Sequence, residues 1–181
     1  MVKYIVELTE SEYKIAKSLL KESLSVREAT KEEYEYAFKK VVQNEINKYY
    51  SDKSKEEQEN AYNDFLDDLD KVWRTKTHAY TTDGTDSFVL TPNKDGSNYI
   101  YLMYIEPEKR NGISALSMFK QALKDSPDGL SFHTNKMNKL AKAAKRYGFV
   151  EYPSSHSNEI FMSNKEGIDG NEWWENSNIP E

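Results

Sequence analysis

The sequence predicts an α+β fold in which a central sheet carries helices on both faces. Three observations support this prediction. Apolar residues at helical spacing, each run preceded by a capping signal, fill most of residues 1–75. Near Thr75 the apolar period changes from 3.6 to 2, which is typical of strands. Strands then alternate with helices after residue 106, so that helices can cover both faces of one sheet.

Composition excludes several classes of protein. The chain has 181 residues, which suits one domain, and no cysteine, which excludes a disulfide framework and a cysteine nucleophile. Three histidines make a zinc site improbable, and we expect no metal. A charged fraction of 31% without any long apolar run excludes a membrane span and predicts a cytoplasmic protein. A net charge of −6 argues against general binding to nucleic acid and favours a cationic partner.

The first half is predicted to hold one strand and three helices. Residues 3–8 alternate as a strand does. Each helix then begins at a hydroxyl residue followed three positions later by a glutamate, the pattern of a capping box: Thr9 and Glu12, Thr30 and Glu33, Ser54 and Glu57. The outer face of the third helix is acidic, and is interpreted as a solvated face or, alternatively, as an anionic docking surface.

The second half is predicted to begin with an antiparallel meander, with strands at residues 77–82, 87–91 and 99–106 joined by turn sequences at Asp83-Gly84 and residues 93–96. A helix over residues 113–124, a strand over 130–133 and a helix over 136–147, capped by Gly148, follow. Strands at 149–152 and 159–163 complete a domain of residues 1–166, of which 1–75 form a helical part and 76–166 the sheet. Residues 167–181 are expected to form a tail, in which Trp173 and Trp174 either clamp over the sheet or bind a partner.

The most informative segment joins the strand ending at Ile105-Glu106-Pro107 to the helix beginning at Ile113. The basic loop between them contains Gly112, and a helix N-terminus presents unpaired backbone amides and the positive end of its dipole. Such a site favours phosphate or diphosphate. An ordinary strand-to-helix turn is the alternative interpretation of the same residues.

This segment resembles the acetyl-CoA-binding motif of the GCN5-related N-acetyltransferases (GNATs). Ile105-x-Pro107-x-x-Arg110 matches the start of that motif in residue type and spacing. Downstream, Asn138-x-x-Ala141 and Gly148-Phe149 are similar to the family's N-x-x-A and G-F segments. The resemblance covers residues 80–163 and implies a GNAT-like mixed, mostly antiparallel sheet, with an extra helix near the N-terminus.

The resemblance also implies acetyl-CoA as cofactor and a set of residues that bind it. Its diphosphate would lie over the loop and the first turn of the helix, and its pantetheine would pair with the preceding strand as an added strand. The implied cofactor-binding residues are Met103, Tyr104, Ile105, Arg110, Asn111, Gly112, Ile113, Ser114, Ala115 and Asn138.

The sequence departs from the family pattern in two places. The loop is irregular, because counting from Gly112 puts Lys109 and Ser114 at motif positions, whereas counting from Arg110 leaves one residue missing before the glycine. The family's tyrosine, which protonates the leaving thiolate, falls at Ala144 or at Lys145, depending on the starting point of the count.

Three residues are therefore candidates for proton transfer: Glu106 at the end of the motif strand, His133 at the end of a short strand, and Tyr147 beside Gly148. Each has a structural alternative, respectively a solvated carboxylate, a hydrogen-bonded histidine and a core side chain.

Two functional hypotheses follow. The first is an acyl-CoA-dependent N-acetyltransferase acting on a primary amine: a lysine, a protein N-terminus, a polyamine or an amino sugar. The alternative is a catalytically degenerate GNAT-like protein that binds a macromolecular partner through its acidic helices or Trp173 and Trp174. The cysteine-free composition, rich in lysine, asparagine and tyrosine, resembles that of phage or mobile-element proteins, so a modulator of a host protein fits both hypotheses.

Overall fold

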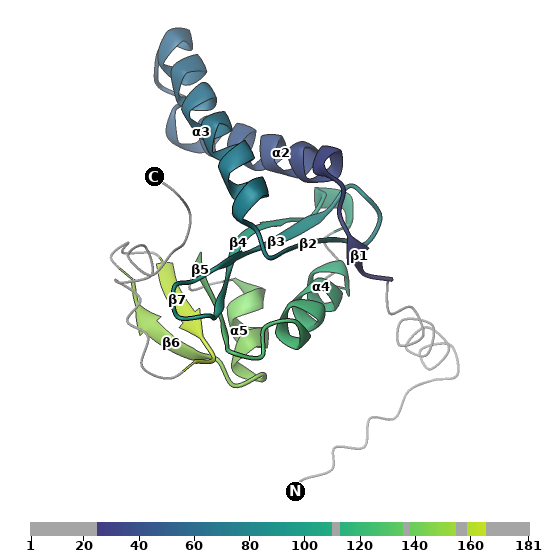
Figure 1. Cartoon of the computed structure of the whole chain (residues 1–181). Coiled ribbons are helices and arrows are strands. Elements are labelled where there is room, and N and C mark those ends of the chain that lie inside the picture. The colour runs from purple at the N-terminus through teal and green to yellow at the C-terminus, as the bar shows by residue number, and fades with distance from the viewer. Residues whose placement is uncertain (1–24, 110–112, 136–137, 155–158, 166–181) are drawn as a thin grey trace, which may run out of the picture.

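The computed structural model describes residues 25–109, 113–135, 138–154 and 159–165. Its centre is a seven-stranded sheet with the strand order β1-β2-β3-β4-β5-β7-β6 (Figure 1). The strands are β1 (Arg27–Glu28), β2 (His78–Thr81), β3 (Ser87–Pro92), β4 (Asn98–Tyr104), β5 (Leu130–Asn135), β6 (Val150–Pro153) and β7 (Glu159–Ser163). Among the pairings of these seven described strands, only β4–β5 is parallel, which confirms the mixed, mostly antiparallel sheet.

One face of the sheet is covered by two long helices, α2 (Lys31–Tyr49) and α3 (Lys55–Thr75), and α3 projects beyond the sheet (Figure 1). Two of the three predicted capping boxes are confirmed, and the third, Thr9 and Glu12, lies outside the described residues. The Thr30 hydroxyl accepts from the Glu33 amide at 3.3 Å, and the Ser54 hydroxyl accepts from the Glu57 amide at 3.2 Å. The helices bury their apolar residues against β3 and β4, and the Tyr34 hydroxyl donates to the Leu69 carbonyl at 3.1 Å to join them.

The opposite face is covered by α4 (Ile113–Lys124) and α5 (Lys139–Lys145). Three phenylalanines, Phe119 of α4, Phe132 of β5 and Phe149, form the centre of this second core, with ring centroids 5.5–6.1 Å apart. Helices on both faces are thus confirmed.

The predicted meander is confirmed, since β2 pairs with β3 and β3 with β4 in antiparallel register. Its third strand contains an irregularity: Val89 lies opposite Leu102 and Leu90 opposite Ile100, which leaves Tyr101 without an opposite residue. Such a bulge increases the local twist and re-aims the following side chains. It therefore sets the direction of the C-terminal half of β4, where the candidate site lies.

The β4–β5 pairing is short and consists of Asn98 opposite Leu130 and Tyr99 opposite Ser131. Both strands continue beyond this point, β4 to Tyr104 and β5 to Asn135, but they no longer pair with each other. Instead β5 pairs along its length with β7, and β4 pairs with β3. The sheet thus separates in the middle, between strands that are each held on the other side.

Several boundaries and pairings differ from the predictions. The two-residue strand β1 was not predicted, because residues 26–28 are too few to show a period. The last strand, β7, lies between β5 and β6, an order that local patterns do not encode. A 3-10 turn, η1 (Pro107–Lys109), follows β4, and Tyr147 lies beyond the end of α5.

The predicted first strand and first helix, and the tail with Trp173 and Trp174, lie outside the described residues. The division into a domain of residues 1–166 and a tail stays a prediction. Among the described helices, none combines the length and the apolar character needed to cross a membrane.

Candidate functional site

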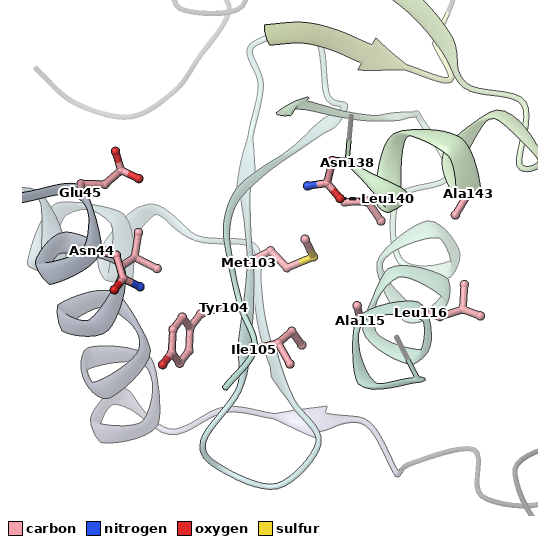
Figure 2. Close-up of a pocket in the computed structure, with 11 residues that line it drawn as sticks. Asn44, Glu45, Met103, Tyr104, Ile105, Ala115, Leu116, Asn138, Leu140 and Ala143 are labelled. Carbon is pink, nitrogen blue, oxygen red and sulfur yellow. Dashed lines mark hydrogen bonds between the residues drawn. The ribbon is translucent and has the colours of Figure 1, made fainter. Parts of the chain in front are cut away.

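A cavity of about 700 Å³ lies beside the C-terminal half of β4, beyond the last β4–β5 pair. It extends from one face of the sheet to the other, since its wall includes residues of α2 on one side and of α4 and α5 on the other (Figure 2). Strand β4 runs between these walls and contributes Met103 and Tyr104, followed by Ile105. We call this cavity, which lies beside the part of β4 that no longer pairs with β5, the passage.

The alternation of side chains along β4 assigns its lining residues to the two sides. Met103 and Ile105 pack against the core under α4 and α5, whereas Tyr104 packs against the core under α2 and α3. All three belong to the predicted cofactor-binding set, and the structure places all three at the cavity. Their alternation gives each side of the cavity its own surface.

The wall formed by α4 and α5 is mostly apolar. It consists of Ala115 and Leu116 in the first turn of α4, and of Leu140 and Ala143 in α5. Asn138, which precedes α5, also lines the cavity and caps this helix, because its Oδ1 accepts from the Leu140 amide at 2.9 Å. The predicted site residues Ala115 and Asn138 therefore lie on the same wall.

The other wall comes from α2 and was not predicted to take part in a site. Val41, Asn44 and Glu45 line the cavity from consecutive turns of this helix. The sequence does hold a signal, because Val41 and Glu45 are four residues apart and so share a helix face. Without knowledge of the tertiary fold, that face reads as part of an ordinary core stripe.

The loop that carries the predicted phosphate site is described only in part. Arg110, Asn111 and Gly112 lie outside the described residues. Ile113 and Ser114 begin α4, and the buried Ser114 hydroxyl lies 3.5 Å from that of Thr82. Lys109, just before the loop, binds the Asp83 carboxylate and donates to the Thr85 hydroxyl at 2.8 Å, so that the β2–β3 turn braces the approach to α4.

Glu106 lies two residues beyond the end of β4 and accepts hydrogen bonds from two phenols. The Tyr36 hydroxyl of α2 donates to one of its oxygens, and the Tyr104 hydroxyl donates to the other at 3.0 Å. The hydrogen bond from Tyr36, opposed by burial and reinforced by Tyr104, lowers the pKa of Glu106 below its usual value. Glu106 is therefore a carboxylate at neutral pH, and it is connected to the cavity through the ring of Tyr104.

His133 lies in β5 and contacts two aromatic residues. Its Nδ1 lies 3.1 Å from the Tyr99 hydroxyl, and its ring centroid lies 4.9 Å from that of Phe161. Tyr99 is largely buried, and burial raises the pKa of its hydroxyl well above the usual value. This pair lies on the α2 face of the sheet but is not part of the cavity wall.

Tyr147 lies past the end of α5 and packs edge-on against Phe119, with centroids 5.8 Å apart. Neither position at which the family tyrosine was counted reaches the cavity. Ala144 is fully buried in the core, and Lys145 is exposed and forms an ion pair with Glu151 at 2.7 Å. Ala143, the residue before these two positions, does line the cavity.

Comparisons with known proteins agree with this architecture. No protein-family model matches the sequence, and no curated protein matches it. An acetyltransferase from Streptococcus agalactiae 2603 superimposes with a TM-score of 0.50 at 12% identity, covering 80% of this chain and 99% of its own. The fold is GNAT-like.

Two further solved structures are similar. PH1933 from Pyrococcus horikoshii has a TM-score of 0.51 at 11% identity, with coverage of 80% and 99%. A GNAT-family acetyltransferase from Staphylococcus aureus Mu50 has a TM-score of 0.48 at 15% identity, with coverage of 78% and 99%. At such identities the likeness concerns the fold alone, and the activity has to be argued from the site.

Proposed function

We propose that the protein is an acyl-CoA-dependent N-acetyltransferase that acts on a primary amine. The observation that carries the proposal is the passage through the sheet, with an apolar wall and a helix N-terminus on one face and a polar wall on the other. A group transfer between two substrates needs both to meet with little freedom. A cavity lined from both faces of the sheet gives each substrate a wall of its own beside β4.

Acetyl-CoA fits the side formed by α4 and α5. The first turn of α4 contains no acidic residue, and Ala115 in that turn lines the cavity. Its backbone amides, together with those of Arg110, Asn111 and Gly112, would hold the diphosphate. Met103 on β4 and the aliphatic side chains of α5 would flank the pantetheine, which can pair with a strand that has left its neighbour.

The acceptor then enters from the α2 side. The amine nitrogen attacks the thioester carbonyl carbon, a carbon–nitrogen bond forms, and the carbon–sulfur bond breaks. One proton leaves the nitrogen, and one proton is taken up by the thiolate. We assign proton removal to Glu106, which is ionised at neutral pH and is linked to the cavity wall through its hydrogen bond from Tyr104. His133 and Tyr147 are assigned no step, because neither side chain lines the cavity.

The experiment that tests this function is ligand-induced stabilisation. A ligand at 100 times its Kd stabilises the native state by about 2.7 kcal/mol, so acetyl-CoA should raise Tm by several degrees. Ala115→Glu should abolish this shift, since it places bulk and negative charge on the cavity wall. An acidic residue in the first turn of a helix is favourable for the dipole, so the variant should still fold.

Ser117→Glu is the matched control, because it adds the same side chain to the same helix outside the cavity wall. The Ser117→Glu variant should keep the acetyl-CoA-induced rise in Tm. The competing hypothesis of a partner-binding protein without cofactor predicts no shift for the wild type at millimolar acetyl-CoA. That result would contradict the proposed function.

A further inference from the structure

The cavity contains one charged side chain among the lining residues that the structure describes, and that side chain is Glu45. The other lining residues are aliphatic side chains, two amides and one tyrosine. Glu45 is half-buried, and within the described part of the chain it forms no ion pair with a basic side chain. A carboxylate in such a cavity lacks part of the hydration that it has on an open surface.

Glu45 lies on the acceptor side of the passage. Figure 2 places Asn44 and Glu45 on α2, across β4 from Ala115 and Ala143. If acetyl-CoA occupies the α4 and α5 side, the acceptor meets this carboxylate as it enters. The nearest basic group along α2, Lys48, donates to the Tyr49 hydroxyl. The pKa of Lys48 is raised, first by this hydrogen bond and then by nearby carboxylates that include Glu45 and Glu159.

We propose that Glu45 binds a second cationic group of the acceptor, so that the substrate is an amine carrying another positive charge. The reacting nitrogen has to be uncharged to attack the thioester, and an ion pair with Glu45 would hold it in the protonated, unreactive form. An ammonium or guanidinium elsewhere in the acceptor keeps its charge and pairs with Glu45 throughout. The carboxylate thereby selects dicationic acceptors and places their other end in the gap beside β4.

This inference rests on the proposed function, and the test separates the two. CoA is titrated first, and its binding tests the cofactor site. The CoA-loaded protein is then titrated with 1,5-diaminopentane and with 1-aminopentane, which differ in the second cationic group. The wild type should bind the diamine about tenfold more tightly, as one charge-assisted hydrogen bond provides.

Glu45→Gln should bind both amines equally while its affinity for CoA stays that of the wild type. Asp64→Asn, on the exposed side of α3, removes the same charge away from the cavity and should keep the preference. Lys48→Gln removes a competing cation and should keep or increase the preference for the diamine. Binding of CoA without any preference for the diamine, a preference that survives in Glu45→Gln, or no binding of either amine would overturn the inference.

Discussion

Single side chains of the β2–β3 turn position the loop that leads into α4. Asp83 and Thr85 hold Lys109, while the buried Asp86 accepts from the Thr81 hydroxyl and the Thr82 amide, both at 2.7 Å. Gly84 in the same turn has a φ of +88°, and a Cβ there would lie 2.5 Å from a Glu33 carboxylate oxygen. The turn is thus fitted between the start of α2 and the approach to α4.

The Asp83–Lys109 contact predicts a pH-dependent contribution to stability. Burial raises the pKa of Asp83, but hydrogen bonds from Lys109 and Thr85 outweigh it and lower the pKa to about 2. A lowered carboxyl pKa stabilises the native state above the unfolded pKa of about 3.9, and this stabilisation is lost as pH falls towards 2. Because the pair is partly exposed, Asp83→Asn should lower the free energy of unfolding by only about 1 kcal/mol at pH 7.

Chemical denaturation at pH 7 and at acid pH measures this difference. The two proteins should become equally stable as pH approaches 2. If the difference in free energy of unfolding between wild type and Asp83→Asn stays constant from pH 7 to acid pH, the charge of the carboxylate does not cause the stabilisation.

Glu106 belongs to the same scale, since one carboxylate joins α2 to the end of β4. If it removes the amine proton, Glu106→Gln should lower kcat by about 100-fold and leave the acetyl-CoA-induced rise in Tm unchanged. Glu108→Gln, in the exposed turn η1, is the control and should keep full activity. Thiol release in the presence of a panel of amines provides the measurement. Wild-type activity in Glu106→Gln would exclude the assigned role.

At the scale of elements, the orientation of α5 decides which of its residues face the cavity. Ala141 and Ala144 are buried in the core, whereas Ala143 faces the passage. Counting along the motif places the family's tyrosine at Ala144 or at Lys145. The two counts differ by one residue because this segment is not the same length as the family's motif. One residue rotates a side chain by about 100° around a helix, which is enough to move it from core to cavity.

This orientation predicts opposite results for two neighbouring substitutions. Ala143→Tyr should be tolerated, because its ring enters the cavity. Ala144→Tyr should destabilise the fold by about 3 kcal/mol, because it overpacks a filled core. Thermal denaturation of the two variants tests this, and the reverse order of stability would contradict the placement of α5.

The sequence predicted the elements well and the site only partly. Capping boxes at Thr30 and Ser54 and the meander are encoded by neighbouring residues, so local patterns reveal them. The position of β7 between β5 and β6 and the contribution of Glu45 depend on contacts between distant segments. Met103 to Ile105 belong to a local sequence motif and could therefore be proposed from the sequence. The α2 wall depends on tertiary contacts and could not.

At the scale of the whole molecule, β3 and β4 belong to both cores. Leu90 and Ile100 pack under α4, and Val89 and Leu102 pack under α2. Because the same strands form the floor of both cores, neither core can unfold and leave the other intact. The two walls of the passage are therefore parts of one cooperative structure.

Cooperativity predicts that a destabilising substitution in either core lowers the midpoint of one unfolding transition of the whole domain. Ile46→Ala in α2 and Met118→Ala in α4 should each lower the free energy of unfolding by about 2–5 kcal/mol and move the same unfolding midpoint. Far-UV circular dichroism and tryptophan fluorescence should give coincident curves for both variants. Two separate transitions, only one of which responds to each substitution, would contradict the shared core.

The central claim is that acetyl-CoA occupies the passage between β4 and β5 from the side of α4 and α5. Methyl NMR of the labelled protein during a CoA titration tests it most directly. We expect the methyl resonances of Met103, Ile105, Ala115 and Leu140 to shift with one common saturation curve. The resonances of Val72, a buried residue of α3 on the other face of the sheet, should stay unchanged. Saturating shifts at methyl groups outside the cavity but not at these four residues would contradict the account. The absence of any shift at millimolar CoA would contradict it as well.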